Sequence, residues 1–145
     1  MSAALAQSAP SIRSSSVTGT SSRARLAGRI LTGLAIAFLT FDVVIKLVGA
    51  KAALDGTVAL GYQPHHLLII GMIGLACLIL YVIPRTAPLG AILWTGYLGG
   101  AIATQLRVDN PLFSHILFPI YVAALIWGGL YLRDARVRAL VQGTR

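Results

Sequence analysis

The sequence predicts an all-α integral membrane protein, an up-down four-helix bundle with a disordered N-terminal tail. Hydrophobic residues make up 57% of the 145 positions, and charged residues only 11%. Soluble domains carry about 25% charged residues, and the mean hydropathy of this chain is +0.80. The apolar residues form four runs, each long enough to cross a bilayer as a helix. Helices are required because an open strand edge in lipid would leave backbone groups unpaired.

Residues 1–28 are expected to form the disordered tail, on the cytoplasmic side. Ser, Ala and Arg dominate this stretch, and it contains no acidic residue and no apolar periodicity. Such a composition cannot bury a core. It also has the character of an Arg-rich, Ser-rich transit peptide, so a targeting role is the alternative.

The membrane domain is predicted to span residues 29–138, with a short cytoplasmic tail at 139–145. At a rise of about 1.5 Å per residue, each apolar run covers roughly 30 Å of hydrocarbon. The links after the second and third runs are short, which predicts antiparallel neighbours. The longer link at 49–66 is expected to hold a short amphipathic turn, and Pro119 predicts a kink in the last helix. The four helices are expected at about 30–48, 67–83, 87–106 and 112–132.

The basic residues predict the orientation. If the N-terminus is cytoplasmic, nine Lys and Arg side chains flank the helices on that side and only Lys51 and Arg107 flank them on the other. Such a bias is typical of cytoplasmic ends, so both termini are expected in the cytoplasm of a bacterial cell, with the helices in its inner membrane. A nucleic-acid partner is not expected, because these residues flank apolar segments instead of forming a stripe.

Two charges interrupt the first apolar run, in "FLTFDVVIKLVG" (Phe38–Gly49). Asp42 and Lys46 lie four residues apart, so they can pair on one helix face. At the bilayer centre each would cost roughly 2.5–3.5 kcal/mol. The helix therefore needs neighbouring helices, this pairing, or a Lys46 side chain that reaches the interface.

All four helices are expected to bring polar residues to the same, non-cytoplasmic third of the bundle. Gln105 ends the third helix there, and His115 begins the fourth. Ionisable groups within a membrane indicate a functional site by default. Asp42, Lys46, Gln105 and His115 are thus the candidate ligand or proton site, and structural pairing near a wet interface is the alternative.

Two further patterns bear on sites and partners. Gly96, Gly100 and Thr104 repeat at the small-xxx-small spacing that lets helices approach closely in lipid. The pattern predicts packing within the chain, with a homodimer face as the alternative. No metal site is predicted, because the adjacent His65 and His66 point about 100° apart on a helix and lack a spaced partner ligand.

The segments "YVIPRT" (Tyr81–Thr86), "LGAILWTGYLGGAIAT" (Leu89–Thr104) and "PLFSHILFP" (Pro111–Pro119) resemble the DoxX-like family. The "FD…K" of the first helix and the "LGY" before the second match this family too, and the resemblance covers about residues 28–138. This sequence differs from the family pattern at two positions, because relatives often carry Glu where Gly74 stands and His where Gln105 stands.

The resemblance implies a four-helix protein of the bacterial inner membrane. The member that gave the family its name is a subunit of a thiosulfate–quinone oxidoreductase, and other relatives are linked to membrane redox or thiol-stress assemblies. It therefore implies an accessory subunit with redox-protein partners and quinone as the candidate cofactor. A non-catalytic scaffold and a small proton-coupled transporter are the alternatives. The sequence contains no nucleophile–base set or phosphate loop that would indicate a self-contained enzyme.

Overall fold

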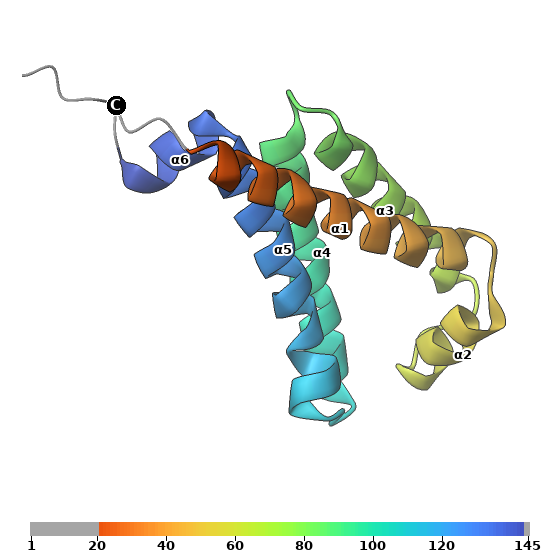
Figure 1. Cartoon of the computed structure of the whole chain (residues 1–145). Helices are drawn as coiled ribbons and strands as arrows, with labels where there is room; N and C mark the ends of the chain where they lie inside the picture. The colour runs from red at the N-terminus through yellow and green to blue at the C-terminus, as the bar shows by residue number, and fades with distance from the viewer. Residues whose placement is uncertain (1–20, 144–145) are drawn as a thin grey trace, which may run out of the picture.

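The computed structural model describes residues 21–143, which form α-helices and one π-helical turn without a strand among them (Figure 1). The predicted all-α fold class is confirmed. The elements in chain order are α1 (Ser22–Leu47), α2 (Lys51–Ala59), α3 (His66–Val82), α4 (Ala87–Arg107), η1 (Leu112–Ile116), α5 (Phe118–Arg133) and α6 (Ala135–Gln142).

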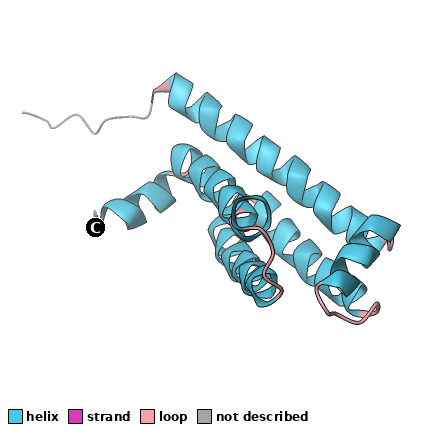
Figure 2. Ribbon diagram, turned by 90° about the horizontal axis from the view of Figure 1, so that it is seen from below, coloured by secondary structure: helices cyan, strands magenta, loops and turns pink. Residues whose placement is uncertain are grey.

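Four long helices form the bundle. Around it, α1 packs between α5 and α3, and α4 packs against both α3 and α5. Figure 1 shows α1 and α3 running alongside each other, while α4 and α5 form a second pair inclined to the first. Seen from below in Figure 2, the two pairs again cross at a large angle. The pairs lie close together at the end where α1 begins and α5 ends, and they diverge toward α2.

Glycines set where α1 touches its neighbours. A Cβ on Gly129 of α5 would lie 2.5 Å from Thr32 Oγ1, and one on Gly28 of α1 would lie 2.8 Å from Leu132 Cβ. Further along α1, a Cβ on Gly71 of α3 would lie 3.1 Å from Lys46 Cβ. Helix α1 is therefore held close to α5 in its first half and close to α3 in its second half, which makes the pairs diverge.

Helix α1 begins earlier than the sequence predicted. Ser21 caps it by accepting a hydrogen bond from the backbone N–H of Ala24 at 3.3 Å, as Ser does at helix starts. Residues 22–28, which were assigned to the tail, are thus helical, and Gly28 packs against α5. The remainder of the predicted tail, residues 1–20, lies outside the described residues.

The fourth predicted span is interrupted, as Pro119 suggested. Residues Leu112–Ile116 form a π-helical turn in which the Leu117 N–H donates to the Leu112 carbonyl at 2.8 Å. Helix α5 then starts at Phe118 with Pro119 in its first turn. Proline has no N–H to continue the preceding ladder, so the chain restarts the helix at a position where that loss costs little.

Two short helices flank the bundle. Helix α2 occupies the link at 49–66, where the sequence predicted only a short turn, and Gly49 and Gly61 adopt positive φ (66° and 82°) at the ends of α1 and α2. Helix α6 runs across the predicted boundary at residue 138. It is capped by Asp134, whose carboxylate accepts from the Arg136 N–H at 2.9 Å.

The surface of the bundle is apolar. Among the described residues, Ser22–Leu47 and Leu112–Arg133 are long and apolar enough to cross a membrane, and α3 is a shorter apolar helix of 17 residues. Soluble proteins rarely expose contiguous apolar patches larger than a few hundred Å², so lipid is the expected surrounding. Large apolar side chains are exposed on all four long helices, for example Leu34, Phe41, Ile69, Met72, Ile92 and Ile120.

Candidate functional site

A cavity of about 410 Å³ lies between the two helix pairs, at the end where they diverge. Its walls are mostly apolar and aromatic, with Phe38 and Leu39 from α1, Trp94 and Leu98 from α4, and Phe118 from α5. A second hollow of about 460 Å³ adjoins it beneath α2. Ligand pockets typically enclose about 300–1,000 Å³ with apolar walls and a few polar groups, and this cavity has both properties.

Asp42, Lys46, Gln105 and His115 line both hollows. The structure thus brings together all four residues that the sequence singled out, from α1, α4 and η1. They lie where the apolar cavity meets the hollow under α2. Their role as a ligand or proton site remains a prediction, and what the structure gives is their common location.

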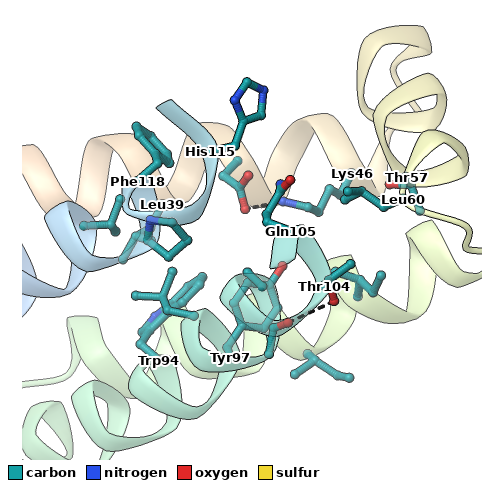
Figure 3. A pocket seen from close by; sticks show the side chains of 18 of the residues that line it. Leu39, Lys46, Thr57, Leu60, Trp94, Tyr97, Thr104, Gln105, His115 and Phe118 are labelled. Atoms are coloured by element: carbon teal, nitrogen blue, oxygen red, sulfur yellow. Dashed lines mark hydrogen bonds and ion pairs between the residues drawn. The ribbon is translucent and has the colours of Figure 1, made fainter. Parts of the chain in front are cut away.

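Asp42 and Lys46 form an ion pair along one face of α1. The side chains are 27% and 17% exposed respectively, so both charges are largely removed from solvent. Figure 3 shows the Lys46 side chain reaching into the site toward Gln105. The pairing removes much of the cost of placing each charge in an apolar helix, and it fixes the ammonium group at the cavity.

Gln105 and His115 differ in how they meet the cavity. The Gln105 side-chain carbonyl accepts a hydrogen bond from the Asn110 amide, which ties the end of α4 to the loop that follows. The His115 ring lies beside the Ser114 hydroxyl, with Oγ 2.8 Å from Nδ1. Its side chain is exposed, and the ring turns away from the cavity in Figure 3. Of the four residues, His115 is therefore the one whose side chain points least into the cavity.

The segment around α2 contributes residues that the sequence analysis did not select. Tyr62 follows α2, and its hydroxyl lies 2.9 Å from Thr104 Oγ1 of α4. The Arg107 guanidinium donates to the Leu60 carbonyl at the end of α2. These contacts hold α2 over the site. The only sequence feature that pointed to this segment was the "LGY" before the second span. That motif does not indicate which distant residues Leu60 and Tyr62 contact.

Trp94 forms a wall of the cavity and packs edge-to-face on Tyr97, with ring centroids 4.9 Å apart. Its side chain is fully buried, and its indole Nε1–H has no hydrogen-bond partner among the described residues. Buried donors are normally paired. Gly74 lies behind this wall, and a Cβ there would be 3.7 Å from Trp94.

The two glycines of the predicted packing stripe on α4 are not in close contact with another helix among residues 21–143. Gly96 and Gly100 are exposed, and a Cβ on either would meet nothing within 4 Å. Thr104 instead bonds to Tyr62 and to the Gly100 carbonyl. The two glycines therefore make no close helix contact in the described part of the chain, and Gly100 instead lines the cavity. Their role in packing stays a prediction. The close helix contacts use Gly28, Gly90 and Gly129.

Metal-ligating side chains are scattered in the described part of the chain. No group of three His, Cys, Asp or Glu side chains there lies close enough to hold a metal ion. The rings of His65 and His66 are tilted by 58° to each other with centroids 4.1 Å apart, and His66 Nδ1 accepts from the Gln63 N–H at 3.2 Å. The two rings therefore contact each other and the preceding turn.

The family model described as the DoxX-like family matches residues 30–129. This range takes in most of α1, all of α2, α3, α4 and η1, and most of α5, and so includes every residue of the cavity. Neither a curated protein nor a solved structure matches the chain. The chain belongs to the DoxX-like family, a family of membrane proteins.

Proposed function

We propose that this DoxX-like protein is an accessory subunit of a membrane redox system and that its cavity binds the head group of a quinone. The observation that carries the proposal is the Asp42–Lys46 pair at the edge of a cavity with apolar and aromatic walls. An aromatic head group with carbonyl oxygens needs such walls and a few hydrogen-bond donors. A bound quinone supplies the electron-accepting chemistry, which the chain's own side chains lack.

The residues of the cavity would bind and orient this group. The Lys46 ammonium donates hydrogen bonds and carries the charge that favours a carbonyl oxygen. Asp42 keeps that ammonium in place, and Trp94 and Tyr97 provide flat surfaces. No self-contained catalysis is proposed, so the electrons must come from a protein partner.

The proposed location is the bacterial inner membrane, with both termini in the cytoplasm. The divergent end of the bundle, which holds the cavity, then faces the other side of the membrane. Single cysteines at Asp109 and Gln142, both exposed, would test this in intact cells with a membrane-impermeant maleimide. Labelling of the Asp109→Cys variant alone is expected, and labelling of the Gln142→Cys variant alone would reverse the orientation.

Quinone binding is measurable in the purified protein through the fluorescence of the buried Trp94, in a Trp127→Phe background that leaves Trp94 as the single tryptophan. A short-chain quinone is expected to quench this fluorescence saturably, and Gln105→Leu is expected to weaken binding several-fold. Gln63→Leu is the matched control, because Gln63 is exposed and outside both hollows. Equal, non-saturating quenching in all variants would refute quinone binding. Co-purification with a reductase or sulfurtransferase from native membranes tests the partner.

A non-catalytic scaffold is the second candidate, and the Asp42–Lys46 pair also favours it. The two charges satisfy each other, so they can serve as a structural link without any ligand. In that case partners would bind normally in variants that no longer bind quinone. A proton-coupled transporter ranks third, because Lys46 neutralises the acid that would have to carry the proton.

A further inference from the structure

We propose that α6 is an interfacial helix that lies on the membrane surface and binds a layer of acidic phospholipid. This surface lies at the opposite end of the bundle from the cavity, so the proposal does not depend on quinone binding. It rests on the apolar face of α6, on the contacts that fix its direction, and on the charge of this end.

The apolar face of α6 is only half covered by the protein. Val137, Leu140 and Val141 share one side of the helix, because residues three and four apart lie on the same face. Val137 is 2% exposed and belongs to the hydrophobic core, whereas Leu140 and Val141 are 78% and 67% exposed. In Figures 1 and 2, α6 leads away sideways from the end of the bundle. The second half of the face therefore projects past the edge of the protein, toward the lipid that surrounds the bundle.

Hydrogen bonds to the end of α5 and to the turn between α3 and α4 hold α6 in this direction. Arg138 Nη1 donates to the carbonyls of Tyr131 and Leu132, each at 3.0 Å, and so caps the end of α5. Arg136 Nη2 donates to the Pro84 carbonyl in the turn between α3 and α4 at 2.8 Å. The helix is thus fixed to two separate elements, and its exposed apolar side chains cannot fold back onto the bundle.

The charge of this end favours an acidic lipid surface. Seven arginines lie here with a single acidic residue, Asp134, which is paired to Arg136 at 2.8 Å. Lipid-facing apolar residues flanked by Arg are typical of helices that lie in a membrane interface, and clustered basic residues attract anionic headgroups. The arginines are Arg23, Arg25, Arg29, Arg85, Arg133, Arg136 and Arg138.

The depth of α6 in the bilayer tests the proposal. An environment-sensitive fluorophore is attached to Val141→Cys and, as the matched control, to Ala135→Cys, both in a Cys77→Ala background. Ala135 is exposed and lies on the side of α6 opposite Val137. Each labelled protein is placed in nanodiscs of phosphatidylcholine, with and without phosphatidylglycerol. Quenching by iodide is then compared with quenching by lipid that carries a spin label near the glycerol.

The Val141 label is expected to be quenched several-fold more by the spin-labelled lipid than by iodide. The Ala135 label is expected to be quenched more by iodide than by the spin-labelled lipid. The difference should grow with phosphatidylglycerol and shrink near 1 M salt, where the Debye length falls to about 3 Å. Equal access of iodide to both labels would overturn the proposal, because α6 would then lie in water. Protection of the Val141 label from both quenchers would also overturn it, since a protein, including a second copy, would cover that face.

Discussion

Removing one charge of the Asp42–Lys46 pair is expected to destabilise the protein more than removing both. In Lys46→Met the Asp42 carboxylate keeps its charge in an apolar helix without its counter-ion. In Asp42→Asn the lysine is left unpaired, but its long side chain can extend toward the nearby interface. The double variant leaves no charge to compensate. We therefore expect Lys46→Met to be the least stable of the three.

The magnitude follows from the burial of the pair. Removing one partner of a fully buried pair costs about 3–5 kcal/mol, whereas exposed pairs contribute about 0–1 kcal/mol. The side chains here are 17% and 27% exposed, which places this pair between the two limits. We expect about 3 kcal/mol for Lys46→Met and about 1–2 kcal/mol for Asp42→Asn, with a coupling of at least about 1 kcal/mol in the double-mutant cycle.

The assay is reversible unfolding of the four proteins in mixed micelles, followed by helix content and by Trp fluorescence. Lys51→Met and Asp55→Asn provide a matched cycle, because this pair has the same spacing on α2 and a distance of 2.6 Å but is 88% and 61% exposed. Its coupling is expected near zero to about 0.5 kcal/mol. Additive effects at Asp42 and Lys46 would refute the reasoning, since they would mean that the two charges do not stabilise each other.

Two further predictions concern the other end of the bundle. Gly129→Ala should destabilise the protein by about 1–3 kcal/mol, because the new Cβ would lie 2.5 Å from Thr32 Oγ1; Gly96→Ala, which meets nothing within 4 Å, should be neutral or slightly stabilising in the same unfolding assay. Hydrogen bonds from Arg136 lower the pKa of Asp134 below its usual 3.8, so its contribution is complete above that value and is lost as pH falls through the lowered pKa. The protection factors of the α6 amides, which are the intrinsic exchange rates divided by the measured rates at the same pH, should therefore fall only at strongly acidic pH. An Asp134→Asn variant should show no such fall, and a loss of protection between pH 5 and 7 would contradict this assignment.

The all-α fold class and the family could be predicted from the sequence, because lipid permits few backbone structures and hydropathy identifies the apolar segments. The pairing of Asp42 with Lys46 was also predictable, since it depends only on the spacing within one helix. The interruption of the last helix near Pro119 was predictable as well, because proline lacks the backbone N–H that a continuous helix needs. In each case the determining interaction is local.

Contacts between helices were not predictable in the same way. The sequence pointed to Gly96 and Gly100 as packing residues, yet Gly28 and Gly129 make the close contacts between α1 and α5. A small-xxx-small pattern shows which face of a helix is smooth, but not which helix, if any, lies against it. The hydrogen bond from Tyr62 to Thr104 joins residues 42 positions apart, and no local pattern indicates it.

The position of the cavity follows from the distribution of small and large side chains along α1. Near its start, Thr32 meets Gly129 of α5 almost backbone to backbone. About two turns later, Phe38 packs edge-to-face on Phe118 of α5 with ring centroids 5.5 Å apart, so the same two helices are held apart there. Over this half α1 stays close to α3 through Gly71 instead. The helix pairs must therefore diverge where Asp42 and Lys46 lie. The ion pair faces a cavity because Gly129 lets α1 and α5 approach closely near the start of α1, whereas Phe38 and Phe118 keep the two helices apart further along.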